Sequence, residues 1–101
     1  MDSQARFEER MRALRIGFVA GLPERLATMR AALRADDRAT LQHEAHRLAG
    51  TGVSYGLPQM TNWGRAVEKK IKGGAPLLAL SEDLDQLSTL IASVNPFELT
   101  G

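Results

Sequence analysis

Residues 41–52, LQHEAHRLAGTG, combine an apolar face and a bare polar face when they are placed on a helix. The apolar face is formed by Leu41, Ala45 and Leu48. On a helix of about 100° per residue these members lie within about 40° of Leu41, whereas His46 lies about 140° away and Gly50 about 180°. Glycine inside a helix costs about 1 kcal/mol relative to alanine, and close approach by another molecule is one reason to keep it. The stretch therefore predicts a helix that is buried on one side and presents an imidazole beside a bare backbone patch on the other.

Apolar residues recur at helical spacing along nearly the whole chain. In the first third they are Phe7, Met11, Leu14, Phe18, Leu22, Leu26, Met29 and Leu33. In the second half they are Leu57, Met60, Val67 and Ile71, followed by Leu77, Leu80, Leu84, Leu87, Ile91 and Val94. The alternation typical of strands is absent and the connections are short, which favours antiparallel neighbours. We predict an all-α fold: an antiparallel up-and-down four-helix bundle over about residues 18–94, with an additional N-terminal helical segment over about 3–16.

Glycine, proline and capping residues mark the ends of these segments. Pro23 interrupts the first apolar stripe, and it either kinks a single helix or starts a second one. The Asp36-Asp37 pair carries side chains that cap helix N-termini, so a helix should begin there. Gly73-Gly74 and Asn95-Pro96 should end the last two helices.

The composition indicates one globular domain, residues 1–101, and excludes several classes of function. With 44% apolar and 25% charged residues, the chain has ordinary globular usage. The net charge is only +1 and aromatic residues make up 5%, so we expect no nucleic acid as a partner. Cysteine is absent, which removes disulfides, thiol nucleophiles and thiolate metal sites. No leader pattern and no bilayer-spanning apolar run is found, so we expect a cytoplasmic protein without membrane association.

His46 is the candidate reactive residue. An exposed imidazole has a pKa of about 6.5, so much of it is neutral near pH 7. A neutral ring nitrogen is a competent nucleophile toward phosphorus, and phosphoryl transfer needs in-line access more than elaborate local chemistry. The alternative is that His46 is an ordinary solvated histidine, and the neighbouring glycines make this alternative less favoured.

Two other kinds of site are disfavoured. His43 and His46 lie one turn apart, but the spacing does not fit the zinc-protease pattern and no third ligand is close in sequence, so no metal site is expected. Thr51 and Ser54 lack a group that would orient a base and lack the Gly-x-Ser-x-Gly turn, which argues against hydrolase chemistry.

The residues that follow His46 form an ordered pattern. They read His46-Arg47-Leu48-Ala49-Gly50, then the small residues Thr51 and Gly52, then Gly56-Leu57. Together with LPERL at 22–26 and LRADD at 33–37, this pattern resembles the histidine-containing phosphotransfer (HPt) domains of phosphorelays over about residues 15–95. The usual pattern of that family is His-x-Leu-Lys-Gly, then small residues, then Gly-Leu before the next helix.

The resemblance implies a four-helix bundle that displays a phosphorylatable His46. Such a protein exchanges a phosphoryl group with the aspartate of a response-regulator receiver domain. It would be a phosphocarrier rather than an enzyme, because the receiver would supply Mg²⁺ and most of the catalysis, and the chain would bind no cofactor of its own. The implied partners are a receiver domain and a sensor or hybrid histidine kinase, and we expect a monomer.

One position departs from the family pattern. Ala49 stands where the family has a lysine, so the cation that balances the charge of phosphohistidine should come from elsewhere. Lys72 is the first candidate and Arg47 the second. Glu68 lies near the place where the family often has a polar partner for the histidine, and a carboxylate there would fix the tautomer and raise the basicity of the other ring nitrogen.

A surface for partner docking is expected around His46. Its expected members are His43, Ala49, Gly50, Val53 and Arg65. The alanine at position 49 also motivates a second hypothesis, a bundle that is not phosphorylated and binds a receiver domain or kinase as an adaptor or inhibitor. A third hypothesis, a helical interaction or dimerisation element, depends on the apolar stripe from Phe7 to Phe18.

Overall fold

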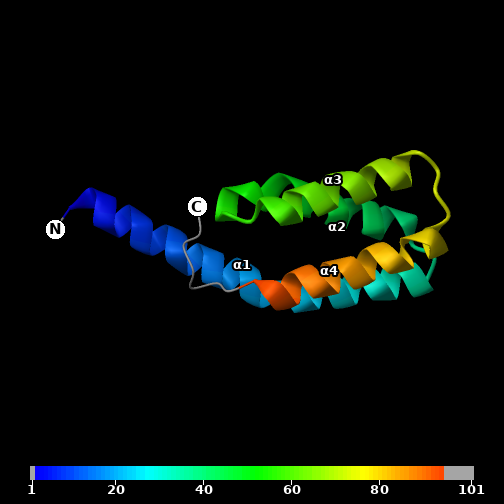
Figure 1. The fold of residues 1–101 in the computed structure, drawn as a ribbon, viewed down its shortest axis with the longest axis horizontal. Helices are drawn as coiled ribbons and strands as arrows, with labels where there is room; N and C mark the ends of the chain where they lie inside the picture. The colour runs from blue at the N-terminus through cyan, green and yellow to red at the C-terminus, as the bar shows by residue number, and fades with distance from the viewer. Residues whose placement is uncertain (1, 95–101) are drawn as a thin grey trace.

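The computed structural model describes residues 2–94, which form four α-helices and two short 3₁₀ helices. They are α1 (Ser3–Arg34), α2 (Arg38–Thr51), η1 (Val53–Tyr55), α3 (Pro58–Lys72), η2 (Leu77–Leu80) and α4 (Ser81–Ser93). In Figure 1 the chain reverses direction at each connection between α-helices, so successive helices run antiparallel. No strand occurs within residues 2–94, and the predicted all-α helical bundle is confirmed.

α1 continues without a break through Pro23, so a single helix is the correct alternative at this residue. Proline removes one backbone donor from the helix. On either side of it, however, Leu22 is buried and Leu26 packs against the core, and continuing the helix keeps both of them in contact with the other helices. The segment expected over about 3–16 is therefore the first half of α1 and not a separate helix.

The first half of α1 projects beyond the other three helices (Figure 1). Its apolar residues Phe7 and Leu14 are consequently 60% and 47% exposed. Although α1 is the longest helix, neither it nor any other helix within residues 2–94 is long and apolar enough to cross a membrane.

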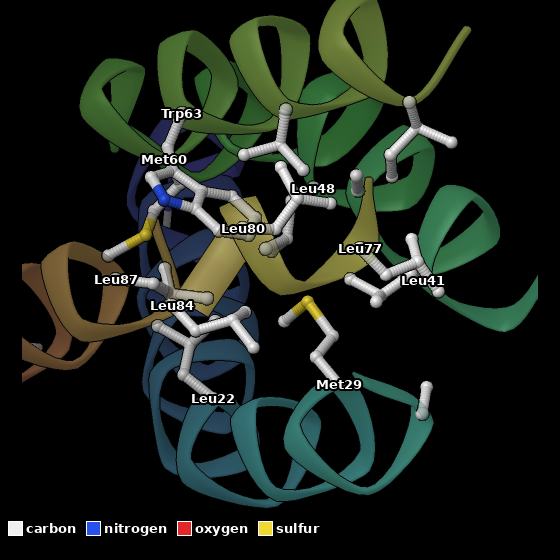
Figure 2. Close-up of a cluster of buried hydrophobic side chains, with 14 of the residues drawn as sticks. Leu22, Met29, Leu41, Leu48, Met60, Trp63, Leu77, Leu80, Leu84 and Leu87 are labelled. Carbon is white, nitrogen blue, oxygen red and sulfur yellow. The ribbon is translucent and has the colours of Figure 1, made fainter. Parts of the chain in front are cut away.

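The core fills the space between the four helices (Figure 2). Its larger members include Leu22, Met29, Leu41, Leu48, Met60, Trp63, Leu77, Leu80, Leu84 and Leu87. These are residues from the apolar stripes, together with Trp63, whose Nε1 donates a hydrogen bond to the backbone oxygen of Asp83 at 2.8 Å. Because α2 turns Leu41, Ala45 and Leu48 fully inward, its opposite face is left to solvent.

α2 and α3 pack closely, and a glycine permits it. A Cβ placed on Gly64 of α3 would lie 2.6 Å from the backbone oxygen of Ala45 and 2.6 Å from the backbone nitrogen of Ala49. Such distances are shorter than van der Waals contact, so only glycine fits at this position without separating the helices. The spacing between α2 and α3 positions every side chain of the site described below.

The start of α2 follows from the capping chemistry that the sequence predicts. The Asp37 carboxylate accepts hydrogen bonds from the Thr40 hydroxyl at 2.6 Å and from the Thr40 backbone nitrogen at 3.1 Å, and both lower the pKa of Asp37. Asp36 precedes it with a φ of 55°, a left-handed conformation that aspartate tolerates better than most residues. At the other end of the bundle, α4 ends at Ser93, and the expected stop at Asn95-Pro96 lies outside the described residues.

Candidate functional site

His46 projects from the solvent face of α2. Its side chain is 71% exposed, while Ala45 and Leu48 on either side of it in sequence are fully buried. The contrast arises because one helical face is covered by α1 and α3, whereas the imidazole lies outside that face, at its border with α3. The ring is therefore open to another molecule without any rearrangement of the core.

Glu68 of α3 contacts the imidazole directly. Its Oε2 lies 2.9 Å from Nδ1 of His46, and its side chain is only 14% exposed. An ionised carboxylate can only accept hydrogen bonds, so the Nδ1 of a neutral His46 must carry the hydrogen and donate it. The remaining lone pair of the ring is then on Nε2, the nitrogen that has no hydrogen bond to any described residue.

Lys72 joins the same carboxylate from one turn further along α3. Its Nζ lies 3.3 Å from Oε2 of Glu68. Desolvation raises the pKa of Glu68. The hydrogen bonds from His46 and Lys72, together with the positive charges of these residues, lower the pKa by more than desolvation raises it, so the pKa of Glu68 is below its ordinary value. Glu68 is therefore ionised at neutral pH, as the tautomer assignment of His46 requires.

An open groove runs between α2 and α3 beside the imidazole. It is lined by Ala39, Gln42, His43, His46, Glu68 and Lys72. His43 and Lys72, two of the predicted residues, thus lie on the same side of the bundle as His46. Gln42 was not predicted, although its position four residues before His46 places it one turn away on the same helical face.

The docking residues on the other side of His46 form a surface of small and exposed groups. A Cβ added to Gly50 would have no heavy atom within 4 Å, and Val53 is 60% exposed. Ala49 is half-buried, because its backbone lies under Gly64 of α3. Ala49 and Gly50 follow His46 by three and four residues on α2, so they lie next to the imidazole along the helix, and Val53 begins η1 just beyond the end of α2.

Arg65 lies on the α3 side of this surface. It precedes Glu68 by three residues and lines a second hollow with Glu68, Lys69 and Lys72. Its side chain is exposed, and none of the described residues forms an ion pair or hydrogen bond with its guanidinium.

Arg47 is not brought to His46, contrary to the expectation that it supports the phosphate. Its guanidinium lies 3.4 Å from the carboxylate of Glu44, which is buried at 7% exposure. The physical reason is helical geometry, because successive side chains point about 100° apart and Arg47 leaves the helix beside Glu44 and not beside the imidazole.

The described residues do not form a cluster of side chains that would bind a metal ion. Within residues 2–94 no group of three or more histidine, aspartate, glutamate or cysteine side chains lies close enough to hold a metal ion. The site consists of an imidazole, a carboxylate and nearby cations, a set suited to a nitrogen nucleophile and an anionic group.

Comparison with known protein families gives one match. The family described as Hpt domain matches residues 13–95, which include all of α2, α3 and α4 and most of α1. Neither the curated proteins nor the solved structures gave a match.

Proposed function

Because the chain belongs to the Hpt domain family, which acts in two-component phosphorelays, we propose that it carries a phosphoryl group on Nε2 of His46. The observation that carries the proposal is the 2.9 Å contact between Nδ1 of His46 and Glu68. This contact leaves Nε2 unprotonated and directed away from the carboxylate, as nucleophilic attack requires. The site residues from α2 and α3 then have distinct tasks.

The proposed donor or acceptor is the aspartyl phosphate of a receiver domain. In the forward step the lone pair of Nε2 attacks phosphorus, a nitrogen–phosphorus bond forms, and the bond between phosphorus and the aspartyl oxygen breaks. The aspartate leaves as a carboxylate and the ring becomes positively charged, so atoms and charge balance without the movement of a proton. The reverse step returns the phosphoryl group to a receiver aspartate.

Glu68 would stabilise the ring while it carries this positive charge. The carboxylate already accepts the hydrogen of Nδ1, and its low pKa means that it remains ionised during the reaction. A fixed negative charge next to a developing positive one lowers the energy of the transition state without reorganisation of solvent. The Mg²⁺ ion required for the reaction would be bound by the receiver and not by this chain, which acts as a phosphocarrier.

The surface around His46 is suited to the approach of a receiver domain. Gly50 leaves open space one turn after the imidazole, and Val53 offers an exposed apolar contact beyond it. A sensor or hybrid histidine kinase would be the other partner in the relay. In-line attack needs the two proteins to come within bonding distance, and small side chains next to His46 allow that approach.

Phosphorylation by a small phosphoramidate donor tests the proposal without a partner protein. The donor's phosphorus–nitrogen bond breaks, ammonia leaves, and the new bond forms on the histidine. Intact mass should show one added phosphoryl group that is lost in acid, both in the wild-type protein and in His43→Gln. His46→Gln should remain unmodified.

His43 is the matched control because it is an exposed histidine on the same helix and in the same groove. An acid-labile phosphate that persists in His46→Gln would contradict the assignment. No phosphate on the folded wild-type protein, combined with retained binding to a receiver, would instead support the adaptor hypothesis that Ala49 motivates.

A further inference from the structure

The geometry points to Arg65 of α3 as the residue that binds the phosphoryl group once it is on His46. This inference rests on the proposed function and adds a residue for which the sequence pattern suggested only a docking role. It also replaces Lys72 and Arg47, the two cations first considered for this task.

The register of α2 against α3 places Arg65 beside the bare patch. Val53 N donates a hydrogen bond to the Thr61 hydroxyl at 2.9 Å, and Glu68 contacts His46 at 2.9 Å. Between these two contacts, Gly64 lies against the backbone of Ala49. Arg65 is the next residue of α3, so it lies across from Ala49 and Gly50, on the edge from which Glu68 reaches the imidazole.

The phosphorylated site keeps a net negative charge that a further cation would offset, because the phosphoryl group carries more negative charge than the single positive charge of the ring. A phosphoryl group on Nε2 carries a charge of about −1.5 to −2 near pH 7, and it would stand close to the ionised Glu68. Lys72 already contacts Oε2 of Glu68 at 3.3 Å, so its charge offsets that of the carboxylate. Arg47 is paired with Glu44. Among residues 2–94, both Arg65 and Lys69 line a hollow with Glu68 and have no ion pair. Arg65 follows Gly64, which packs on α2, by one residue, whereas Lys69 is turned about 40° further from that contact, so Arg65 is the nearer cation to α2.

The space next to His46 admits the guanidinium. Gly50 has no heavy atom within 4 Å of where its Cβ would be, and Ala49 has the shortest side chain. A longer residue at position 49 would occupy the same place from the α2 side. A guanidinium also presents paired N–H donors that match two phosphoryl oxygens, which an ammonium group does not.

Arg65 would act by binding and not by proton transfer. The phosphoryl oxygens would accept hydrogen bonds from the guanidinium, whereas the ring hydrogen on Nδ1 would stay with Glu68. We therefore expect the loss of Arg65 to reduce the rate and extent of phosphorylation while the contact between His46 and Glu68 remains.

The test compares Arg65→Gln with Lys69→Gln. Both variants remove one exposed positive charge from α3, but Lys69 is one position beyond Glu68 and points further from α2. With phosphoramidate as donor, Arg65→Gln should be phosphorylated about threefold to tenfold more slowly than wild type, and Lys69→Gln within about twofold. The ³¹P signal of phosphorylated Arg65→Gln should also titrate with a midpoint higher by about half a pH unit or more, since a neighbouring positive charge has been removed.

Two further variants separate a specific contact from a structural effect. Arg65→Lys should recover part of the rate, and Ala49→Lys combined with Arg65→Gln should recover it from the facing helix. Thermal unfolding followed by circular dichroism shows whether each variant is folded. Rates and ³¹P midpoints equal to wild type in Arg65→Gln would overturn the inference, and a loss seen in Lys72→Gln alone would assign the task to Lys72. In both cases the phosphate on His46 would remain, whereas an unmodified wild-type protein would count against the proposed function itself.

Discussion

Gly64 of α3 lies against the backbone nitrogen of Ala49 so closely that a Cβ on the glycine would approach it to 2.6 Å. The contact lies one helical turn from the pair that defines the site, because Ala49 follows His46 by one turn and Gly64 precedes Glu68 by one turn. It therefore fixes the distance between α2 and α3 at the level of the imidazole. A carboxylate on α3 can reach Nδ1 of His46 only while the two helices remain this close.

Replacement of Gly64 by alanine should destabilise the protein and weaken the site together. The added methyl group collides with backbone atoms that cannot rotate away, and overpacking of this kind costs about 1–3 kcal/mol. Urea denaturation followed by circular dichroism measures the loss, and phosphorylation by phosphoramidate should slow because Glu68 is moved from His46. A free energy of unfolding equal to that of wild type would show that α2 and α3 separate without cost.

Gly50→Ala is the matched control for this glycine and makes a separate prediction. Position 50 has open space around its Cβ and lies in the last turn of α2, so alanine should stabilise the protein by about 0.5 kcal/mol or less through its higher helix propensity. Phosphorylation by the small donor should be unchanged. Transfer from a phosphorylated receiver domain should slow, because the methyl group stands where the partner approaches. Equal receiver transfer in both proteins would remove Gly50 from the docking surface.

Glu68 makes stability depend on pH in the acid range. Its pKa in the folded protein is below the ordinary value, which the unfolded chain keeps. Between these two values the unfolded state binds more protons, so the contribution of Glu68 is present above the ordinary pKa and is lost as the pH falls through the folded one. The difference in urea midpoint between wild type and Glu68→Gln should therefore be larger at pH 6 than at pH 3. A difference that stays constant between these pH values would show that the carboxylate is not held by His46 and Lys72.

Local patterns in the sequence were sufficient to predict the helices and the cap of α2. The spacing of apolar residues within a single helix is enough to identify its buried face, such as the face of Leu41 and Leu48. The cap of α2 is equally local, because Asp37 accepts its hydrogen bond from Thr40, only three positions away. The path through Pro23 could not be predicted in this way. The path depends on whether other helices bury the turns of α1 before and after Pro23, and these contacts cannot be read from the sequence of α1 alone.

For the candidate site, the sequence indicated which residues to consider, but it did not indicate which of them would be in contact. The identity of His46 and the choice of Glu68 came from a family pattern and from spacing along one helix. Whether Glu68 reaches the imidazole depends on the register of α2 against α3, which Gly64 sets by a contact between residues distant in sequence. The direction of Arg47 could not be predicted from spacing alone, because it depends on the ion pair that Arg47 forms with the buried Glu44.

Arg47→Gln should consequently affect stability and leave the chemistry intact. Removing its guanidinium leaves the buried carboxylate of Glu44 with less compensation, but the pair is half-exposed on the arginine side, so we expect a loss of about 0.5–1 kcal/mol. Phosphorylation of His46 by phosphoramidate should stay within about twofold of wild type. A larger drop in rate at unchanged stability would return Arg47 to the site.

Removal of residues 1–12 distinguishes a phosphocarrier from a helical association element. This segment precedes the match to the Hpt domain family, which begins at residue 13, and it projects from the bundle with Phe7 exposed at 60% (Figure 1). The buried core begins at Val19, and none of residues 2–12 belongs to it, so the shortened protein should fold, as circular dichroism would show, and should accept phosphate at the wild-type rate. Sedimentation of both proteins over a range of concentrations supplies the second measurement. If the full chain associates and the shortened chain does not, the apolar stripe that starts at Phe7 binds a second copy, and association and phosphorylation are then separate properties of α1 and of α2 with α3.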